Sequence, residues 1–241
     1  MPEAKQIRSM FDSIAPEYDA FNHLTSFGID RGWRRRALKF IKGPDVLDAA
    51  CGTGDFSIAI AHKIKGVRIT GVDISGGMLA KMKAKIAREG LSPSIFAADG
   101  TPLNGVRAEI GDCCNLSFDE GSFDSVAVAF GVRNFEDREK ALGEFLRVLR
   151  PGGHFVMLEL SIPRNPIARA AFKFYFTHIM PRIGSRLTRN RAAYRYLPAS
   201  VMTFPQRKEW AETLEKTGFG NIRSRALSMG ICMLYSAEKS L

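Results

Sequence analysis

The sequence predicts an α/β fold: a seven-stranded, mostly parallel β-sheet with helices on both faces, an N-terminal helical segment and a helical insertion after the fifth strand. Two observations support this prediction. Apolar runs of strand length alternate with amphipathic stretches of helix length, and glycine-rich turns separate them. Strands that are connected through helices in this way lie parallel to one another in a single sheet.

The individual elements follow from the same periodicity. The expected strands are Asp45–Ala50, Val67–Asp73, Arg107–Gly111, Phe123–Phe130, His154–Leu160, Asn221–Leu227 and Ile231–Ala237. The expected helices are Asp55–Lys65, Ser75–Arg88, Asp137–Leu149 and Pro205–Thr217. The turns are marked by Gly52, Gly54, Gly121 and Pro151-Gly152-Gly153.

Two segments interrupt the alternation. The chain up to about Ile41 is helical in pattern and carries the basic cluster Arg31–Arg36, and Asn165–Pro198 is rich in aromatic residues and arginine. Both are expected to cover the active site of one single-domain enzyme; packing against the sheet is compatible with that role. The expected parts are an N-terminal lid (1–41), a cofactor-binding core (42–160), a substrate cap (161–204) and a C-terminal helix with a strand pair (205–241).

Composition limits the class of protein. Of the 241 residues, 45% are hydrophobic and 25% charged, as in ordinary soluble domains. The N-terminus has no apolar leader, and no apolar run reaches the roughly 18 residues of a membrane span, so we expect a cytoplasmic protein. Cys51, Cys113, Cys114 and Cys232 lack zinc-ligand spacing, so no metal site and free thiols are expected.

Positive charge is concentrated in the second half of the chain. The net charge is +10, and no acidic residue lies between Glu159 and Glu209. The basic residues of this stretch are Arg164, Arg169, Lys173, Arg182, Arg186, Arg189, Arg191, Arg195, Arg207 and Lys208. They predict an anionic partner such as lipid headgroups; the alternative is a solvated basic surface.

A glycine-rich turn follows the first strand. Glycines at Gly52 and Gly54 allow the backbone to approach a ligand closely, and the helix N-terminus that follows offers free N–H donors. Dinucleotide-binding turns usually carry a third glycine, where this chain has Ser57. A nucleotide-like cofactor without a pyrophosphate is therefore favoured.

An acidic residue ends the second strand. Asp73 lies about 20 residues after the glycines, where a carboxylate accepts hydrogen bonds from ribose hydroxyls. Its alternative role, capping the next helix, suits Ser75 better. The adenine side is open between Asp99 and Asp112. Spacing favours Asp99, whereas the residues that follow favour Asp112 with Cys113 and make Ser92–Val106 an inserted surface loop.

These motifs resemble the Rossmann-like class I methyltransferases, and further segments resemble the ubiquinone/menaquinone biosynthesis C-methyltransferases from about Ile7 to Lys239. The segments that carry this resemblance are Tyr18–Trp33, Phe130–Asn134, Arg147–Ser161, and Tyr196–Val201 with Phe204-Pro205. The chain departs from the family pattern at Phe21, Asp30, Leu116-Ser117, the long Ser92–Val106 insertion and Ala129, where some members carry serine.

The resemblance implies S-adenosylmethionine as methyl donor, with S-adenosylhomocysteine as product. The cofactor-binding residues it implies are Gly52, Thr53, Gly54, Asp73, Asp112, Cys113 and Ala129. It implies methylation of a ring carbon of a polyprenyl quinol, with another aromatic or lipid-like acceptor as the alternative.

The implied catalytic residues are Arg133 and Asn134, which would hold a substrate oxygen, and Tyr18, which with Asn22 would close over the donor. The alternative for Arg133 is a salt bridge to Glu136 or Asp137. The base stays open between Asp112 and an ordered water near Arg133.

The expected partners are the quinol and, transiently, an anionic membrane surface, since basic residues near such a surface contribute roughly 1 kcal/mol each. Nucleic acid is not expected, because no Asn/Asp-Pro-Pro-aromatic tetrad and no catalytic Pro-Cys pair occurs. The oligomeric state stays open, with a homodimer as one option.

Overall fold

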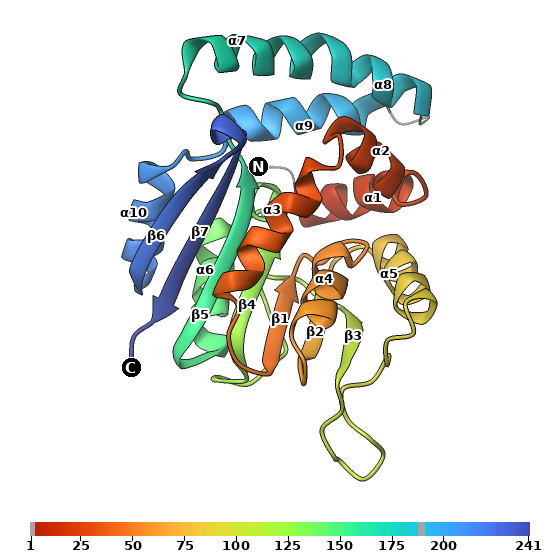
Figure 1. The fold of residues 1–241 in the computed structure, drawn as a ribbon, viewed down its shortest axis with the longest axis vertical. Coiled ribbons are helices and arrows are strands. Elements are labelled where there is room, and N and C mark those ends of the chain that lie inside the picture. The colour runs from red at the N-terminus through yellow and green to blue at the C-terminus, as the bar shows by residue number, and fades with distance from the viewer. Residues whose placement is uncertain (1–2, 188–190) are drawn as a thin grey trace.

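The computed structural model describes residues 3–187 and 191–241, and the side chains of 184–195 lie outside this description. A seven-stranded sheet runs through the molecule in the order β3-β2-β1-β4-β5-β7-β6 (Figure 1). Its strands are β1 (Asp45–Ala49), β2 (Arg68–Asp73), β3 (Gly105–Ile110), β4 (Phe123–Ala129), β5 (Leu149–Leu160), β6 (Phe219–Leu227) and β7 (Cys232–Lys239). Neighbours are parallel from β3 to β5, and β7 is antiparallel to both β5 and β6. The predicted sheet is confirmed.

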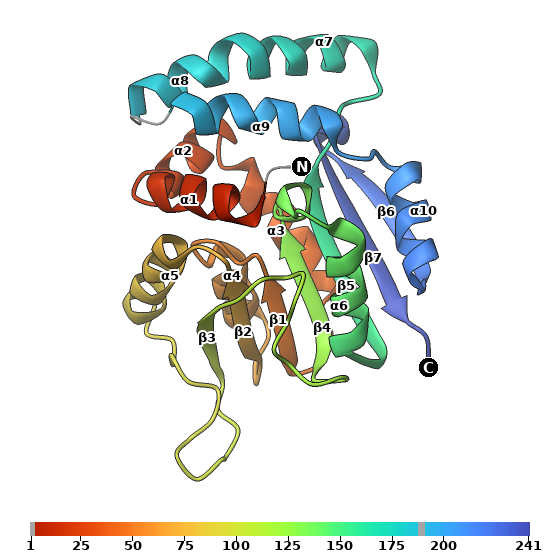
Figure 2. The same cartoon turned by 180° about the vertical axis from the view of Figure 1, so that it is seen from behind.

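Helices cover both faces of the sheet (Figures 1 and 2). The helices α3 (Ile29–Ala37), α4 (Asp55–Lys63) and α5 (Gly76–Arg88) pack on one face, and α6 (Arg138–Val148) and α10 (Lys208–Thr217) pack on the other. Successive strand residues point to opposite faces of the sheet. Val46 therefore packs in the core on the side of α3, α4 and α5, and Leu47 packs in the core on the side of α6 and α10. The apolar runs of the sequence are continuous because the central strands are buried on both faces.

The strand order reverses between β1 and β4. From β1 the chain adds β2 and β3 on one side, and from β4 it adds β5 on the other. Ligands of open α/β sheets bind at such a reversal, outside the carboxyl ends of the strands. Here those ends are the glycine turn after β1 and the 3₁₀ turn η2 (Val132–Asn134) after β4.

Two helical segments contribute helices that lie over this edge of the sheet (Figure 1). The N-terminal segment forms α1 (Ala4–Ile14), α2 (Tyr18–Thr25), α3 and the short 3₁₀ helix η1 (Leu38–Phe40). The insertion after β5 forms α7 (Pro166–Phe174), the π-helix η3 (Tyr175–Ile179), α8 (Met180–Leu187) and α9 (Arg191–Thr203). Both occur where the sequence predicted helical additions.

Two element boundaries differ from the prediction by three or more residues. Strand β5 begins at Leu149 rather than His154, because Pro151-Gly152-Gly153 forms an irregularity inside the strand and pairing with β4 resumes after it. Helix α10 begins at Lys208 rather than Pro205, because Arg207 has a φ of 53° and cannot continue a helix. Ser75 caps α5 as expected, its Oγ accepting the Met78 N–H at 3.1 Å.

The expected surface loop lies between α5 and β3 and projects from the end of the molecule opposite to α7 (Figure 1). The four cysteines are buried free thiols, as predicted. None of the helices in the described part of the chain is long and apolar enough to span a membrane. Of the predicted basic residues, Arg189 and the side chains of Arg186, Arg191 and Arg195 lie outside the described residues.

Candidate active site

The turn between β1 and α4 brings the backbone close to its surroundings at two glycines. Gly54 has a φ of 83°, and a Cβ there would lie 2.5 Å from Met82 Cγ. Gly52 has a φ of 56° and open space where its Cβ would be. That space belongs to two adjoining cavities, so Gly54 is required by packing and Gly52 leaves room for a ligand.

Asp73 joins the ends of β1 and β2. Its Oδ2 accepts the Gly52 N–H and its Oδ1 accepts the Ser75 N–H, each at 2.8 Å. The residue is 8% exposed and lines the smaller cavity. Burial raises the pKa of Asp73, and the backbone hydrogen bonds from Ser75 and Gly52 oppose that rise. The carboxylate is therefore a fixed acceptor at the position expected for a ribose-binding residue.

The structure separates the two candidates for the adenine side. Asp112 lines the smaller cavity together with Asp73 and the buried Cys113, and its Oδ1 accepts the Cys114 N–H at 2.8 Å. Asp99 is exposed in the projecting loop, where a hydrogen bond from the Thr101 N–H lowers its pKa. Asp112 and Cys113 thus share a cavity with Asp73, and Asp99 does not.

The two cavities meet at the strand-order reversal. The smaller has a volume of about 80 Å³ and the larger about 360 Å³. Residues that line both are Tyr18, Ala50, Gly52, Ala129 and Phe130. One bound molecule at this junction could therefore face both cavities, with a polar end at Asp73 and a reactive end in the larger cavity.

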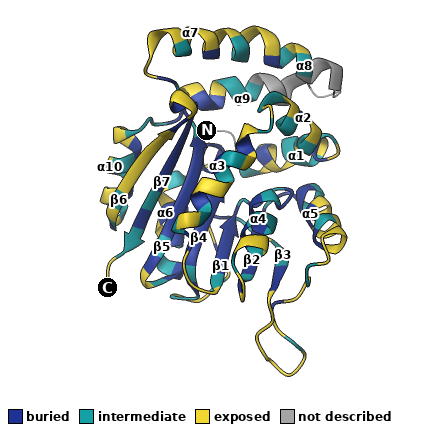
Figure 3. Cartoon of the chain, in the orientation of Figure 1, coloured by how far each residue is buried: buried dark blue, intermediate teal, exposed yellow. Residues whose placement is uncertain are grey.

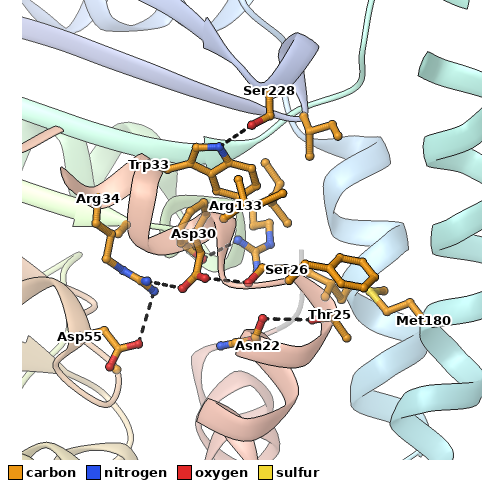
Figure 4. A pocket seen from close by; sticks show the side chains of 18 of the residues that line it. Asn22, Thr25, Ser26, Asp30, Trp33, Arg34, Asp55, Arg133, Met180 and Ser228 are labelled. Atoms are coloured by element: carbon orange, nitrogen blue, oxygen red, sulfur yellow. Dashed lines mark hydrogen bonds and ion pairs between the residues drawn. The ribbon is translucent and has the colours of Figure 1, made fainter. Parts of the chain in front are cut away.

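The larger cavity combines polar and charged groups on one part of its lining with an apolar, aromatic wall (Figure 4). Its polar lining includes Asn22, Thr53 and Arg133. Its apolar lining comes mainly from α3, β5 and the insertion, and includes Trp33, Leu160, Phe172, Tyr175, Phe176, Met180 and Leu197. Apolar cavities with a few placed polar groups are typical of small-molecule sites.

Arg133 lies in η2 and is held by Glu159 of β5. Its Nη1 donates to Glu159 Oε1 at 2.7 Å, and its backbone N–H donates to Glu159 Oε2 at 3.2 Å. Nη1 also donates to the Phe130 carbonyl oxygen at 2.5 Å. Arg133 is 7% exposed and Glu159 1%, so this is a buried ion pair. Arg133 Nε and Asn134 Oδ1 are buried and find no hydrogen-bond partner among the described residues.

The sequence did not indicate Glu159. It offered Glu136 or Asp137 as ion partners for Arg133, and that alternative is wrong. Glu136 instead accepts the Ala4 N–H at 3.0 Å, and Asp137 caps α6 by accepting the Lys140 N–H at 2.9 Å. Asn134 lines the smaller cavity and Arg133 the larger, so the predicted pair faces both.

Tyr18 begins α2 and lines both cavities. Burial of its hydroxyl raises the pKa, and the positive charge of Arg133 and a hydrogen bond with Asn22 partly oppose the rise. The hydroxyl therefore stays protonated at neutral pH and keeps a proton to donate.

Polar contacts fix the N-terminal helices over the site. Thr53 Oγ1 donates to Asp19 Oδ1 at 2.5 Å, and Lys85 Nζ lies 2.7 Å from Asp19 Oδ2 and 2.5 Å from Asp55 Oδ1. On α1, Asp12 Oδ1 accepts the Ser75 hydroxyl at 2.6 Å and the Gly77 N–H at 2.9 Å. The helices α1 and α2 are thus bound to the same turns that carry the predicted cofactor residues.

Asp48 is a site residue that the sequence analysis missed. It lies inside the apolar strand β1, lines the larger cavity and is 1% exposed. Its Oδ2 accepts the Ser57 hydroxyl at 2.5 Å, while its Oδ1 is buried without a partner in the part of the chain described. Desolvation by burial raises its pKa to about 7, against opposing contributions from Ser57 and Arg34. A carboxylate inside an apolar strand was the signal that could have identified it.

His23, Asp30 and Asp55 place potential metal-ligand atoms within 4.8 Å of one another. Arg34 lies between the two carboxylates: it forms a hydrogen bond with Asp30, and its Nη2 lies 3.7 Å from Asp55 (Figure 4). Because a guanidinium already supplies the positive charge, this arrangement is an ion-pair network.

Comparisons with known proteins show which sequences and folds the chain is similar to. Residues 1–239 match the ubiE/COQ5 methyltransferase family. The chain is 41% identical to demethylmenaquinone methyltransferase of Bacteroides fragilis, over 98% of this chain and 94% of the relative. It is 42% identical to the ubiquinone/menaquinone biosynthesis C-methyltransferase UbiE of Geobacter sulfurreducens, over 99% of this chain and 90% of the relative.

A solved structure, that of the [4+2]-cyclase SpnF, superposes with a TM-score of 0.72 at 16% identity, over 100% of this chain and 97% of that one. That likeness concerns the fold alone, because one fold hosts different chemistries. The family match covers nearly the whole chain and includes the glycine turn, Asp73, Arg133 and Asn134. The chain belongs to the ubiE/COQ5 methyltransferase family and is a methyltransferase that uses S-adenosylmethionine.

Proposed function

We propose that the chain methylates a ring carbon of a polyprenyl quinol in respiratory quinone biosynthesis. The observation that carries the proposal is the pair of joined cavities, one at Asp73 and the other walled by aromatic side chains around Arg133. The two relatives described above are named for menaquinone or ubiquinone biosynthesis, which supports a quinol as acceptor. An apolar cavity also suits the tail of such a substrate.

The residues around the glycine turn fit S-adenosylmethionine. Asp73 would accept the ribose hydroxyls, and Asp112 with Cys113 would lie beside the adenine. The open space at Gly52 leaves room for the donor between the two cavities. The unpartnered Asp48 Oδ1 would accept a hydrogen bond from the methionine ammonium, which would bring a positive charge into direct contact with this buried carboxylate. When bound, S-adenosylmethionine supplies an electrophilic methyl group on a sulfonium.

Arg133 would stabilise the acceptor oxygen. A quinol carbon becomes nucleophilic when the neighbouring hydroxyl loses its proton, and a guanidinium favours the resulting phenolate. After this carbon has taken the methyl group, its own hydrogen leaves as a proton, the oxygen is protonated again and the ring becomes aromatic again. Glu159 occupies Nη1 of Arg133, whereas Nε has no partner among the residues described. Glu159 would therefore orient the guanidinium and leave other N–H groups for the substrate. Asn134 and the protonated Tyr18 would complete the hydrogen bonds near the reacting atoms.

The base that removes the quinol proton is proposed to be water held near Arg133. The other candidate from the sequence, Asp112, lines the smaller cavity and is absent from the lining of the larger one. It is therefore badly placed to reach a hydroxyl beside Arg133. The apolar walls of the larger cavity would exclude bulk water from the remaining volume.

We also propose that the protein is cytoplasmic and docks reversibly on an anionic membrane, from which it takes its substrate. The exposed cations Arg164, Arg169, Lys173, Arg182 and Lys208 support this. Arg207 does not belong to that set, because its Nη2 donates to the Ile162 carbonyl oxygen at 3.3 Å and burial lowers its pKa. It helps to hold the insertion against the sheet instead.

The direct test is methyl transfer from labelled S-adenosylmethionine to demethylmenaquinol and to a methoxy-polyprenyl-benzoquinol, with each acceptor kept reduced. We expect one methyl group on a ring carbon of at least one acceptor, identified by mass spectrometry and NMR. Binding of S-adenosylmethionine without transfer to either quinol, together with methylation of an unrelated phenol or lipid, would assign the cavity to another acceptor.

A further inference from the structure

The larger cavity opens between exposed apolar side chains. Phe27, Ile29 and Met229 line it, yet 75%, 46% and 75% of their respective surfaces are exposed. Phe27 lies in the α2–α3 turn, Ile29 is the first residue of α3, and Met229 belongs to the short 3₁₀ helix η4 (Ser228–Gly230). A hydrogen bond of 2.9 Å from Trp33 Nε1 to Ser228 Oγ joins these two parts of the chain (Figure 4). The exposed side chains therefore lie on one side of the same opening.

The backbone at two of these positions is unfavourable for large side chains. Phe27 has a φ of 52° and Met229 a φ of 56°, in the left-handed region that glycine adopts freely. Because both side chains are mostly exposed, they add little to the core that would offset this strain. Burial of these two side chains against something outside the chain would offset the strain.

Helix α7 extends the same apolar surface. Ile167 is 81% exposed and Phe174 58% exposed. Ile167 lies four residues before Ala171, and Phe174 lies three residues after it. Ala171 is itself exposed and lines the cavity. Residues at this spacing share one face of a helix, so Ile167 and Phe174 flank the opening. Figure 3 shows exposed residues along the outer side of α7. We call the set Phe27, Ile29, Ile167, Phe174 and Met229 the mouth surface.

The charge around the mouth surface points to an anionic partner. The residues of the mouth surface belong to the chain segments 20–29, 160–208 and 216–237. None of these segments contains an aspartate or glutamate. Exposed cations within these segments include Arg169 and Lys173. A second copy of the chain would place two basic surfaces face to face in a symmetric dimer, which disfavours that occupant. Apolar side chains surrounded by cations are typical of surfaces that lie on anionic bilayers.

We propose that the mouth surface docks on an anionic lipid bilayer, with its five apolar side chains inserted at the boundary between headgroups and acyl chains. The proposal rests on the quinol methyltransferase function given above, and it names where that enzyme meets its substrate. With the cavity opening against the acyl chains, a polyprenyl tail passes from lipid to protein without crossing water. The cations around the opening contact the headgroups and fix the orientation.

Vesicle binding of two double variants tests the proposal. Flotation would be measured with phosphatidylcholine vesicles, with and without phosphatidylglycerol, for the wild type, for Phe27→Ser/Met229→Ser and for Ile167→Ser/Phe174→Ser. The matched control is Phe96→Ser, since Phe96 is 48% exposed in the loop that projects from the opposite end of the molecule (Figure 1). We expect preference for the anionic vesicles, a loss of about tenfold or more in affinity for each double variant, and wild-type binding by the control.

Equal binding by the wild type and both double variants would overturn the proposal. A wild-type dimer in solution that the same substitutions dissociate would assign the surface to a second copy. Ile167 and Phe174 do not line the cavity. Vesicle binding by the Ile167→Ser/Phe174→Ser variant therefore tests the docking surface even if Phe27→Ser/Met229→Ser changes the shape of the cavity.

A second measurement separates this proposal from the function on which it rests. Methyl transfer would be compared between a short-chain quinol in solution and a long-chain quinol in vesicles. We expect the rate on vesicle-bound substrate to fall relative to the soluble rate in both double variants. A wild type that methylates neither quinol removes the proposed function, whereas unchanged rate ratios in active variants remove only the docking surface.

Discussion

Arg133 Nη1 lies 2.7 Å from Glu159 Oε1 in a pair that is almost completely buried. Replacing Glu159 with glutamine would keep a hydrogen-bond acceptor but leave the guanidinium without a counter-charge. Removing one partner of a buried pair usually destabilises a protein by about 3 kcal/mol. We expect a loss of this size for Glu159→Gln in urea unfolding. The control is Glu212→Gln, which removes an i, i+4 ion pair with Lys208 on the surface of α10. It should lower the free energy of unfolding by less than about 0.5 kcal/mol.

The same pair has a second, functional readout. Glu159→Gln removes the charge that holds Nη1 of Arg133 and weakens the orientation of the guanidinium, so turnover should fall while affinity for S-adenosylmethionine stays close to the wild type. Equal stability and turnover in Glu159→Gln would show that the carboxylate neither supports the fold nor orients Arg133.

Arg133→Ala should lower turnover much more than affinity for S-adenosylmethionine. Negative charge develops on the quinol oxygen during transfer, so a cation there stabilises the transition state more than the neutral substrate. Losing such a contact costs about 3 kcal/mol, on the order of a hundredfold in rate. Arg133→Lys should recover part of the rate, because a point charge does not reproduce a planar fork.

Single-turnover methylation with reduced and oxidised acceptor checks this prediction. The quinone should not react, because its ring is electron-poor and has no hydroxyl to deprotonate. Equal rates with quinone, or an Arg133→Ala enzyme as fast as the wild type, would rule out this use of Arg133.

Asp48 should make stability depend on pH in the direction opposite to most carboxylates. Burial raises its pKa from the ordinary 3.8 to about 7 in the folded state, so the folded protein keeps a proton that the unfolded chain releases. Its contribution to stability is complete below about pH 4 and is lost as the pH rises to about 7. The change amounts to at most about 4 kcal/mol.

Asp48→Asn removes this titration. We expect its free energy of unfolding, relative to the wild type, to rise between about pH 4 and pH 7 and then to level off. Denaturant titrations across this range check the sign, and a relative change in the other direction would mean that Asp48 is ionised in the folded protein at pH 5. Addition of S-adenosylmethionine should reduce the difference, because its ammonium would stabilise the charged carboxylate of the wild type.

Asp73→Ala should weaken S-adenosylmethionine binding by about 3 kcal/mol, because the ribose hydroxyls would lose their acceptor in a buried site. The Gly52 and Ser75 N–H groups lose their acceptor as well, so a moderate fall in thermal stability is also expected. Asp99→Ala is the matched control and should bind the cofactor as the wild type does. Calorimetry measures the affinity of both variants for S-adenosylmethionine. Weaker binding by Asp99→Ala together with wild-type binding by Asp73→Ala would contradict the assignment of Asp73 to the cofactor site.

The sheet could be predicted because each central strand is buried on both faces and therefore appears as an uninterrupted apolar run. The choice of Asp112 over Asp99 could be reached from the residues that follow it, which lead directly into β4. The start of β5 could not be predicted from the sequence. A Pro-Gly-Gly sequence usually ends a strand, whereas here it forms an irregularity within β5.

Glu159 and Asp19 were beyond the reach of sequence reasoning for a different reason. Glu159 approaches Arg133 because β4 and β5 pair with Ala129 opposite Leu158, and the sequence does not give that register. Asp19 reaches Thr53 only because α2 folds over the first βα turn, a contact between segments 34 positions apart. Asp48 was available to the sequence, because an acid within an apolar strand must be neutralised or paired.

Tyr18 forms part of the wall of both cavities, so the donor and acceptor sites are not independent. A ligand that shifts Tyr18 in one cavity changes the shape of the other. Thermodynamic linkage then requires the effect to be reciprocal: if S-adenosylmethionine strengthens quinol binding by some factor, the quinol strengthens S-adenosylmethionine binding by the same factor. S-adenosylhomocysteine lacks the methyl group and the charge of the sulfonium, so we expect it to change the affinity for the methylated quinol by a different factor.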